Sequence, residues 1–191
     1  MDEPTDEIMS ATYLALCEHG FAELTVQDIA DEASVSTAAI HYHYDTKSAL
    51  LEAFLDDLVD RFEARLPPAD APPGQRLSGV LDAIFDPAEA DGDFGTALVE
   101  LKARGPYESG YRRRFERLDD RLRAVIRAAI VDGIEAGTFA PVDPATVADV
   151  IVTALDGALV RAVTLGEDPD RTRAAIEADL ADRLDWSPGQ S

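Results

Sequence analysis

The sequence predicts an all-α protein built from a small N-terminal three-helix domain and a larger C-terminal helical domain. Alanine, leucine, arginine and acidic residues dominate the chain, whereas valine, isoleucine and threonine form no alternating runs bounded by turns. Apolar residues instead recur at the three- and four-residue spacing of amphipathic helices. Clusters of proline and glycine separate these segments and mark the turns between them.

The segment Thr25–Leu51 carries the most specific pattern in the chain. Thr25 and Asp28 have the spacing of a capping box, which predicts the start of a short helix. After a tight turn, Ser36 is the predicted N-cap of a second short helix that reaches Tyr42. Two short helices joined by a few residues, the second with small or aromatic outward positions, are typical of a helix-turn-helix.

Longer helices are predicted on both sides of this segment. Apolar residues at helical spacing predict a helix over about 5–19, and Gly20 is its predicted stop. Asp45 or Thr46 is the predicted cap of a helix over 47–66. The first half of that helix closes the helix-turn-helix core, and its second half leads away as the connector.

We therefore assign residues 1–54 to the helix-turn-helix domain and residues 67–191 to a second domain. The segment PPADAPPG, at the start of the second domain, reads as a loop. An aspartate followed by proline predicts the start of each of the last two helices, because proline suits the first helical position. The predicted helices of the second domain cover about 75–85, 94–104, 107 or 109 to 136, 144–165 and 169–184.

A family resemblance rests on the N-terminal pieces. IMSATYLALCEHGF, LTVQDIADEASVS and AIHYHYDTKSALL, in this order over about 5–54, resemble the DNA-binding domain of the TetR (tetracycline-repressor) family of transcriptional regulators. His41 stands where the family usually has tyrosine, and Tyr44 where it usually has phenylalanine; these changes bear on the operator sequence more than on the fold. The run GIEAGTFAPVDPATVADVI followed by LDGAL resembles, more loosely, the C-terminal domain of many members.

The resemblance implies a regulator that binds double-stranded DNA, most simply a repressor released by a small-molecule effector. Ala38 and Ala39 would let the second short helix approach the major groove and contact thymine methyl groups. Lys47 resembles the family's phosphate-contacting lysine, and Thr25 offers its hydroxyl and a helix N-terminus to another phosphate. The predicted DNA-binding residues are Thr25, Ser36, Thr37, Ala38, Ala39, His41, Tyr42, His43 and Lys47.

In this family the second domain usually encloses a small-molecule site between its helices. The candidates here are the large apolar and aromatic residues of its first three helices. A stripe of phenylalanine and tyrosine at helical spacing is more often part of an ordinary core. The predicted pocket residues are Leu81, Phe85, Phe94, Leu98, Leu101, Tyr107, Tyr111, Phe115 and Leu118.

A homodimer is predicted from the last two helices. The helix over 144–165 is apolar on more faces than one core can cover, and the last helix has a narrow seam of apolar residues. Two helices from each chain would form a four-helix interface with two-fold symmetry. Recognition helices about one helical turn apart (~34–36 Å) would then read a palindromic operator. The predicted interface residues are Leu155, Ala158, Leu159, Ile176 and Leu180.

The charge of the chain conflicts with an ordinary DNA-binding surface. Asp and Glu total 38 against 17 Lys and Arg, and the formal net charge is −21. Nucleic-acid binders usually carry a basic patch. One interpretation is an acidic helical interaction protein that does not bind DNA. The other is a regulator from a salt-loving microbe, because the Debye length falls to about 3 Å in molar salt; the specific helix-turn-helix pattern favours this second interpretation.

Other functions find less support in the sequence. No hydrolase, phosphate-binding or metalloprotease motif is present, so we expect neither an enzyme nor a cofactor. His41 and His43 are two residues apart and do not share a helix face, which argues against a metal site. The Arg112–Arg114 run and the Asp56–Asp57 pair read as solvated surface charge. The absence of a long apolar run and the single Cys17 lead us to expect a cytoplasmic protein without membrane contact.

Overall fold

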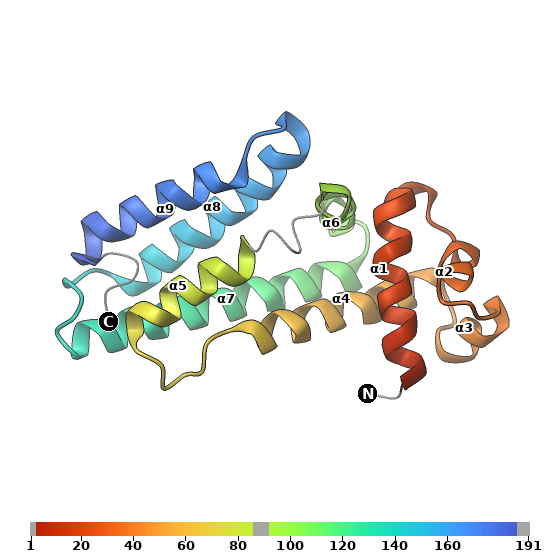
Figure 1. Cartoon of the computed structure of the whole chain (residues 1–191), viewed down its shortest axis with the longest axis horizontal. Coiled ribbons are helices and arrows are strands. Elements are labelled where there is room, and N and C mark those ends of the chain that lie inside the picture. Colours follow the sequence, from red (N-terminus) through yellow and green to blue (C-terminus); the bar gives the residue numbers. More distant parts are fainter. Residues whose placement is uncertain (1–2, 86–91, 187–191) are drawn as a thin grey trace. The chain divides into compact units, whose positions relative to one another are not determined.

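The structure, a computed structural model, describes residues 3–85 and 92–186. All regular secondary structure in these two ranges is α-helical, which confirms the predicted fold class (Figure 1). The helices are α1 (Glu3–Glu23), α2 (Val26–Glu32), α3 (Thr37–His43), α4 (Lys47–Arg65), α5 (Pro73–Ile84), α6 (Gly92–Arg104), α7 (Ser109–Glu135), α8 (Pro144–Leu165) and α9 (Pro169–Leu184).

The predicted helix starts are present as hydrogen-bonded caps. Thr25 and Asp28 form the capping box: the Asp28 backbone N–H donates to Thr25 Oγ1 at 3.2 Å, and the Thr25 N–H donates to Asp28 Oδ2 at 2.7 Å. Ser36 caps α3 by accepting from the Ala39 N–H at 3.2 Å. Side chains of aspartate cap α8 and α9 in the same way, each before a proline. Local sequence therefore sets where these helices begin.

The C-terminal end of α1 contains a sharp bend. The regular helix is interrupted at Gly20, the predicted stop, and a further helical turn continues to Glu23. Gly20 has φ +66° and ψ 170°, so the chain bends sharply there and the last residues form a separate turn. Glycine takes this backbone conformation without the steric cost that a Cβ atom brings.

The chain divides into two compact units: Met1–Arg61 with Glu89–Phe115, and Phe62–Ala88 with Glu116–Ser191. This division is not the predicted one, because α6 and the start of α7 belong to the same unit as the helix-turn-helix. Compact units and functional domains need not coincide, so the assignment of 1–54 and 67–191 to two domains stays a prediction.

The core of the first unit joins α1–α4 to α6. Leu16, Ile29 and Leu51 have no exposed surface, and Ile40 of α3 is 1% exposed. The Phe94 ring of α6 packs against Tyr13 of α1 with ring centroids 4.7 Å apart. Because α6 packs on α1 directly, the helix-turn-helix core continues into the segment after residue 89.

The core of the second unit lies among α5, α7, α8 and α9, and α8 and α9 run side by side (Figure 1). Gly133 of α7 makes room for the buried Phe139 ring, which an added Cβ would meet at 2.1 Å. The Phe139 ring also packs edge-on against Trp186, with centroids 6.1 Å apart. Within the described ranges, no helix has the length and apolar character needed to span a bilayer.

Candidate nucleic-acid interface

The recognition helix α3 presents one face to the core and the rest to solvent. Ile40 anchors it, while Ala38, Ala39, His41 and His43 are exposed and Thr37 is half-buried. Tyr42 is 86% exposed, an unusual state for so large an aromatic side chain. An exposed aromatic residue about one turn after two alanines on a short helix leaves a surface that can enter a groove.

The side chains at the end of α3 contact one another. The His43 ring packs edge-on against the Tyr42 ring with centroids 5.2 Å apart. His41 Nδ1 lies 3.3 Å from the Tyr44 carbonyl oxygen, at the point where α3 ends. Among the residues that the structure describes, no group of three or more His, Cys, Asp or Glu side chains is placed to hold a metal ion.

The Lys47 ammonium uses most of its N–H donors within the chain, whereas a phosphate-contacting lysine needs them free. Its ammonium group donates to the carbonyl oxygen of Phe21 at 3.2 Å and also to that of Leu24. It also lies 4.9 Å from the centroid of the Phe21 ring. Burial, and secondarily the positive charge of Arg104, lower the pKa of Lys47. Lys47 therefore ties the start of α4 to the end of α1, with one N–H left for a phosphate.

Two acidic side chains of α2, those of Asp28 and Asp31, accept hydrogen bonds from neighbouring residues. The Thr25 hydroxyl donates to Asp28 Oδ2 at 2.7 Å, and this bond together with the Thr25 backbone N–H lowers the pKa of Asp28. The Gln27 amide donates to Asp31 Oδ1 at 2.6 Å. The capping carboxylate at Thr25 also occupies the position that a phosphate would take at this helix start. A phosphate could therefore bind at Thr25 only through hydrogen-bond donors that Asp28 does not already use.

Apart from Tyr107, the predicted pocket residues are divided between the cores of the two units. Leu81, Phe85 and Leu118 belong to the core of the second unit, or pack against it. The Tyr107 side chain is 81% exposed and lines neither core. The remaining five belong to or pack against the core of the first unit: Phe94, Leu98, Leu101, Tyr111 and Phe115.

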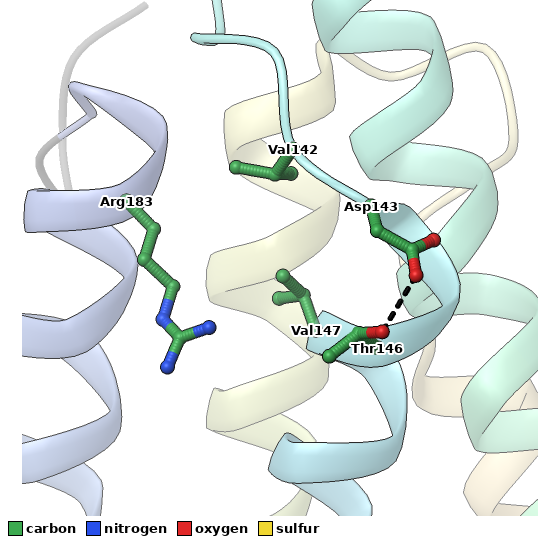
Figure 2. A pocket seen from close by; sticks show the side chains of 5 residues that line it. All are labelled: Val142, Asp143, Thr146, Val147 and Arg183. Carbon is green, nitrogen blue, oxygen red and sulfur yellow. Dashed lines mark hydrogen bonds between the residues drawn. The ribbon is translucent and has the colours of Figure 1, made fainter.

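A surface pocket of about 310 Å³ lies elsewhere, between the start of α8 and the end of α9. Figure 2 shows Arg183 of α9 reaching toward α8, where Asp143 accepts a 2.6 Å hydrogen bond from the Thr146 hydroxyl. Val142 and Val147 supply the apolar part of its wall. None of these five lining residues was among the predicted ones, because no sequence pattern joins the two helix ends.

Four of the five predicted interface residues lie inside the chain's own core. Leu155, Ala158, Ile176 and Leu180 are 8%, 6%, 6% and 1% exposed. Such side chains cannot form a contact surface with a second chain, so this part of the prediction is wrong as to which face of the helices is free. Leu159 is half-buried and keeps some exposed surface.

Sequence reasoning missed two charged residues. Arg114 of α7 bridges two carboxylates of α4: its Nη1 lies 2.9 Å from Glu52 Oε2 and its Nη2 lies 2.7 Å from Asp56 Oδ2. Asp57, read as surface charge, has a side chain only 4% exposed and lies 2.6 Å from Arg61 Nε. Burial raises the pKa of Asp57 against the opposing charge of Arg61. The three- to four-residue period of the helix, followed through the Arg-rich and Asp-rich stretches, would have identified Arg114 and Asp57 as inward-facing positions.

Comparison with known proteins agrees with these features. Residues 8–54 match the family described as "Bacterial regulatory proteins, tetR family", and residues 73–185 match "BetI-type transcriptional repressor, C-terminal". A TetR transcription regulator from Haloarcula marismortui is 39% identical, with a TM-score of 0.88 over 96% of this chain and 100% of that one.

Two further relatives are more distant. The regulator BetI of Paraburkholderia xenovorans is 32% identical over 90 residues, which are 45% of this chain and 46% of that protein. A transcriptional regulator from Saccharomonospora viridis, solved with choline, shares the fold at 21% identity, with a TM-score of 0.82 over 96% of this chain and 98% of that one. The chain spans about half the length of the curated relatives that it matches.

The capped α2–α3 pair, the exposed face of α3 and these matches define a DNA-binding transcriptional regulator of the helix-turn-helix class. The chain belongs to the TetR family.

Proposed function

We propose that this protein is a homodimeric repressor that reads a palindromic operator with α3 and leaves it when a small molecule binds. The observation that carries the proposal is the exposed face of α3, where Tyr42 stands out about one turn after Ala38 and Ala39, which are too small to block a groove. Sequence would be read by Tyr42, His41 and His43, and the Ser36 cap would fix the direction of the helix.

Dimerisation would use the outward side of α8 and α9 instead of their buried side. The exposed or half-buried residues Val150, Thr153, Gly157, Val160 and Thr164 follow one another at intervals of three and four, which is the spacing of a helix–helix seam. Val150 and Val160 are each 44% exposed, and a Cβ added at Gly157 would meet nothing within 4 Å. We call these five residues the outer face of α8. On α9 the exposed small residues are Ala174, Ala175 and Ala178.

The effector would be a small organic molecule bound by the C-terminal helices. The match to a BetI-type C-terminal region and the choline complex of one structural neighbour support a choline-like cation as the first compound to test. An excess of acidic side chains, 38 Asp and Glu against 17 Lys and Arg, would favour a cation over an anion near the protein.

Salt adaptation is the part of the proposal that explains the net charge of −21. The recognition helix contains neither acidic residues nor lysine or arginine, and the one lysine of the helix-turn-helix segment is engaged with carbonyl oxygens. Few counterions would be released from DNA on binding, so affinity should fall only slowly as salt rises. An origin in a salt-rich cytoplasm would make such a surface workable.

The direct test is selection of duplexes from a random library in molar KCl, followed by binding measurements on the selected sequence. Tyr42→Ala or His43→Ala should weaken binding by roughly 1–3 kcal/mol while the circular dichroism spectrum stays that of the wild type. Choline should then be titrated into the complex. If no duplex is enriched at any salt concentration, the protein is not a DNA-binding repressor.

A further inference from the structure

Positive charge is concentrated in one short segment of this acidic chain. Six of the 17 Lys and Arg residues lie within 102–117: Lys102, Arg104, Arg112, Arg113, Arg114 and Arg117. Arg114 is held by Glu52 and Asp56, but Arg104, the last residue of α6, is exposed. This segment lies outside the helix-turn-helix in sequence, although residues up to Phe115 belong to the same compact unit.

Arg104 lies against the turn that leads into α2. Its guanidinium carbon is 5.0 Å from the centroid of the Phe21 ring, and the Lys47 ammonium is 4.9 Å from the same centroid. Two cations thus flank one aromatic ring, an arrangement that neutralises neither of them. Lys47 is itself bonded to the carbonyl oxygens of Phe21 and Leu24, in the turn that leads into α2.

The α6 helix is fastened to this turn by a second contact. The Phe21 backbone N–H donates to Glu100 Oε2 at 2.7 Å, one helical turn before Arg104. An added Cβ at Gly20 would meet the same oxygen at 3.3 Å, so the bend at Gly20 lets the two segments approach. Glu100 and the Phe21 ring together hold the end of α6 at the edge of the helix-turn-helix.

We propose that Arg104 is a DNA-backbone contact: a residue of α6 that binds a phosphate beside Lys47. This inference rests on the proposed function. A cation over a ring retains its N–H donors, and arginine presents five of them in a fork that matches a phosphate. Lys47 has only one N–H left, so Arg104 supplies the charge that the helix-turn-helix segment lacks.

Charge complementarity favours DNA over a protein as the occupant of this edge. Lys47 and Arg104 both lie within 5.0 Å of the Phe21 ring centroid, and two neighbouring cations favour an anionic partner. The consequence is that α6, a helix within the matched BetI-type region, would touch DNA itself. A shift of α6 on effector binding would then withdraw a DNA contact without any change in α3.

The experiment compares Arg104→Gln, Arg104→Lys and the control Arg183→Gln by fluorescence anisotropy on a duplex selected by the wild type and on a scrambled duplex. KCl is varied from dilute to molar. Each neutralised phosphate contributes about 0.9 to the slope of log K against log salt, so Arg104→Gln should reduce the slope by about that amount per bound protomer. The affinity lost relative to the wild type should therefore grow, for both duplexes, by roughly eightfold per protomer for each tenfold dilution of KCl.

Arg104→Lys should recover most of the slope, and Arg183→Gln, with the same loss of charge on α9, should leave it unchanged. Arg104→Met keeps the side-chain stem over Phe21 and should behave like Arg104→Gln. An unaltered slope for Arg104→Gln, with wild-type binding intact, would overturn this inference and leave the proposed function standing. Failure of the wild type to bind any duplex would overturn both.

Discussion

Gly157→Ala tests whether the outer face of α8 is a contact between two helices. In the isolated chain the new methyl group meets nothing within 4 Å. Alanine is favoured over glycine inside a helix by about 0.8–1.0 kcal/mol, so the folded monomer should become more stable by about that amount. That gain is present in free and associated chains alike and therefore cancels from the dimer dissociation constant.

In the dimer the methyl group would lie where a partner helix comes close. Overpacking of this kind costs about 1–3 kcal/mol per site, and a two-fold dimer contains two such sites. Even the lower figure, about 2 kcal/mol for the pair, raises the dissociation constant roughly thirtyfold. The substitution should thus act in opposite directions on monomer stability and on association.

Sedimentation equilibrium gives the dissociation constant, and urea unfolding at a concentration below it gives monomer stability. Val160→Glu is the companion variant: Val160 is 44% exposed, so the charge should hardly affect the monomer but should abolish association. A wild-type dimer whose dissociation constant is unchanged by both substitutions would place the interface elsewhere and refute the reasoning.

Two further predictions concern stability within one chain. Gly133→Ala should lower the free energy of unfolding by roughly 1–2 kcal/mol, because the clash with the buried Phe139 ring outweighs the helix gain; greater stability on urea unfolding would contradict this. Asp57→Asn should raise stability at pH 7, because burial raises the pKa of Asp57 above 3.8 and the wild type loses stability as pH rises through that raised pKa. Thermal unfolding of both proteins from pH 4 to 7 tests this, and a less stable variant at pH 7 would show that the Asp57–Arg61 pair stabilises the fold.

The helices were predictable because their ends are encoded locally. Thr25, Ser36 and Asp143 are caps whose side chains act on residues two or three positions away, and the structure places each helix start beside them. Gly20 shows the limit of such local rules. The predicted stop is present as a positive φ, but nothing in the local sequence indicated the helical turn that follows it, where the Phe21 N–H donates to Glu100 of α6.

Which face of a helix points inward was less predictable. The α8 helix is apolar nearly all round, so periodicity could not tell Leu155, which is buried, from Val160, which is exposed. The predicted pocket residues divide between two cores for a related reason: Phe94 and Phe85 look alike in sequence but join different cores. Contacts such as Arg114 with Glu52 join residues far apart along the chain, which a single sequence does not reveal.

The edge-on packing of Trp186 against Phe139 has an optical consequence. Trp186 is the single tryptophan of the chain, and it is 5% exposed in the core of the second unit. Its fluorescence therefore reports on that unit alone, whereas far-ultraviolet circular dichroism reports on the helices of both. If the two signals change together on heating, the units unfold as one cooperative body; if the emission shifts at a different temperature, each unit has its own melting transition.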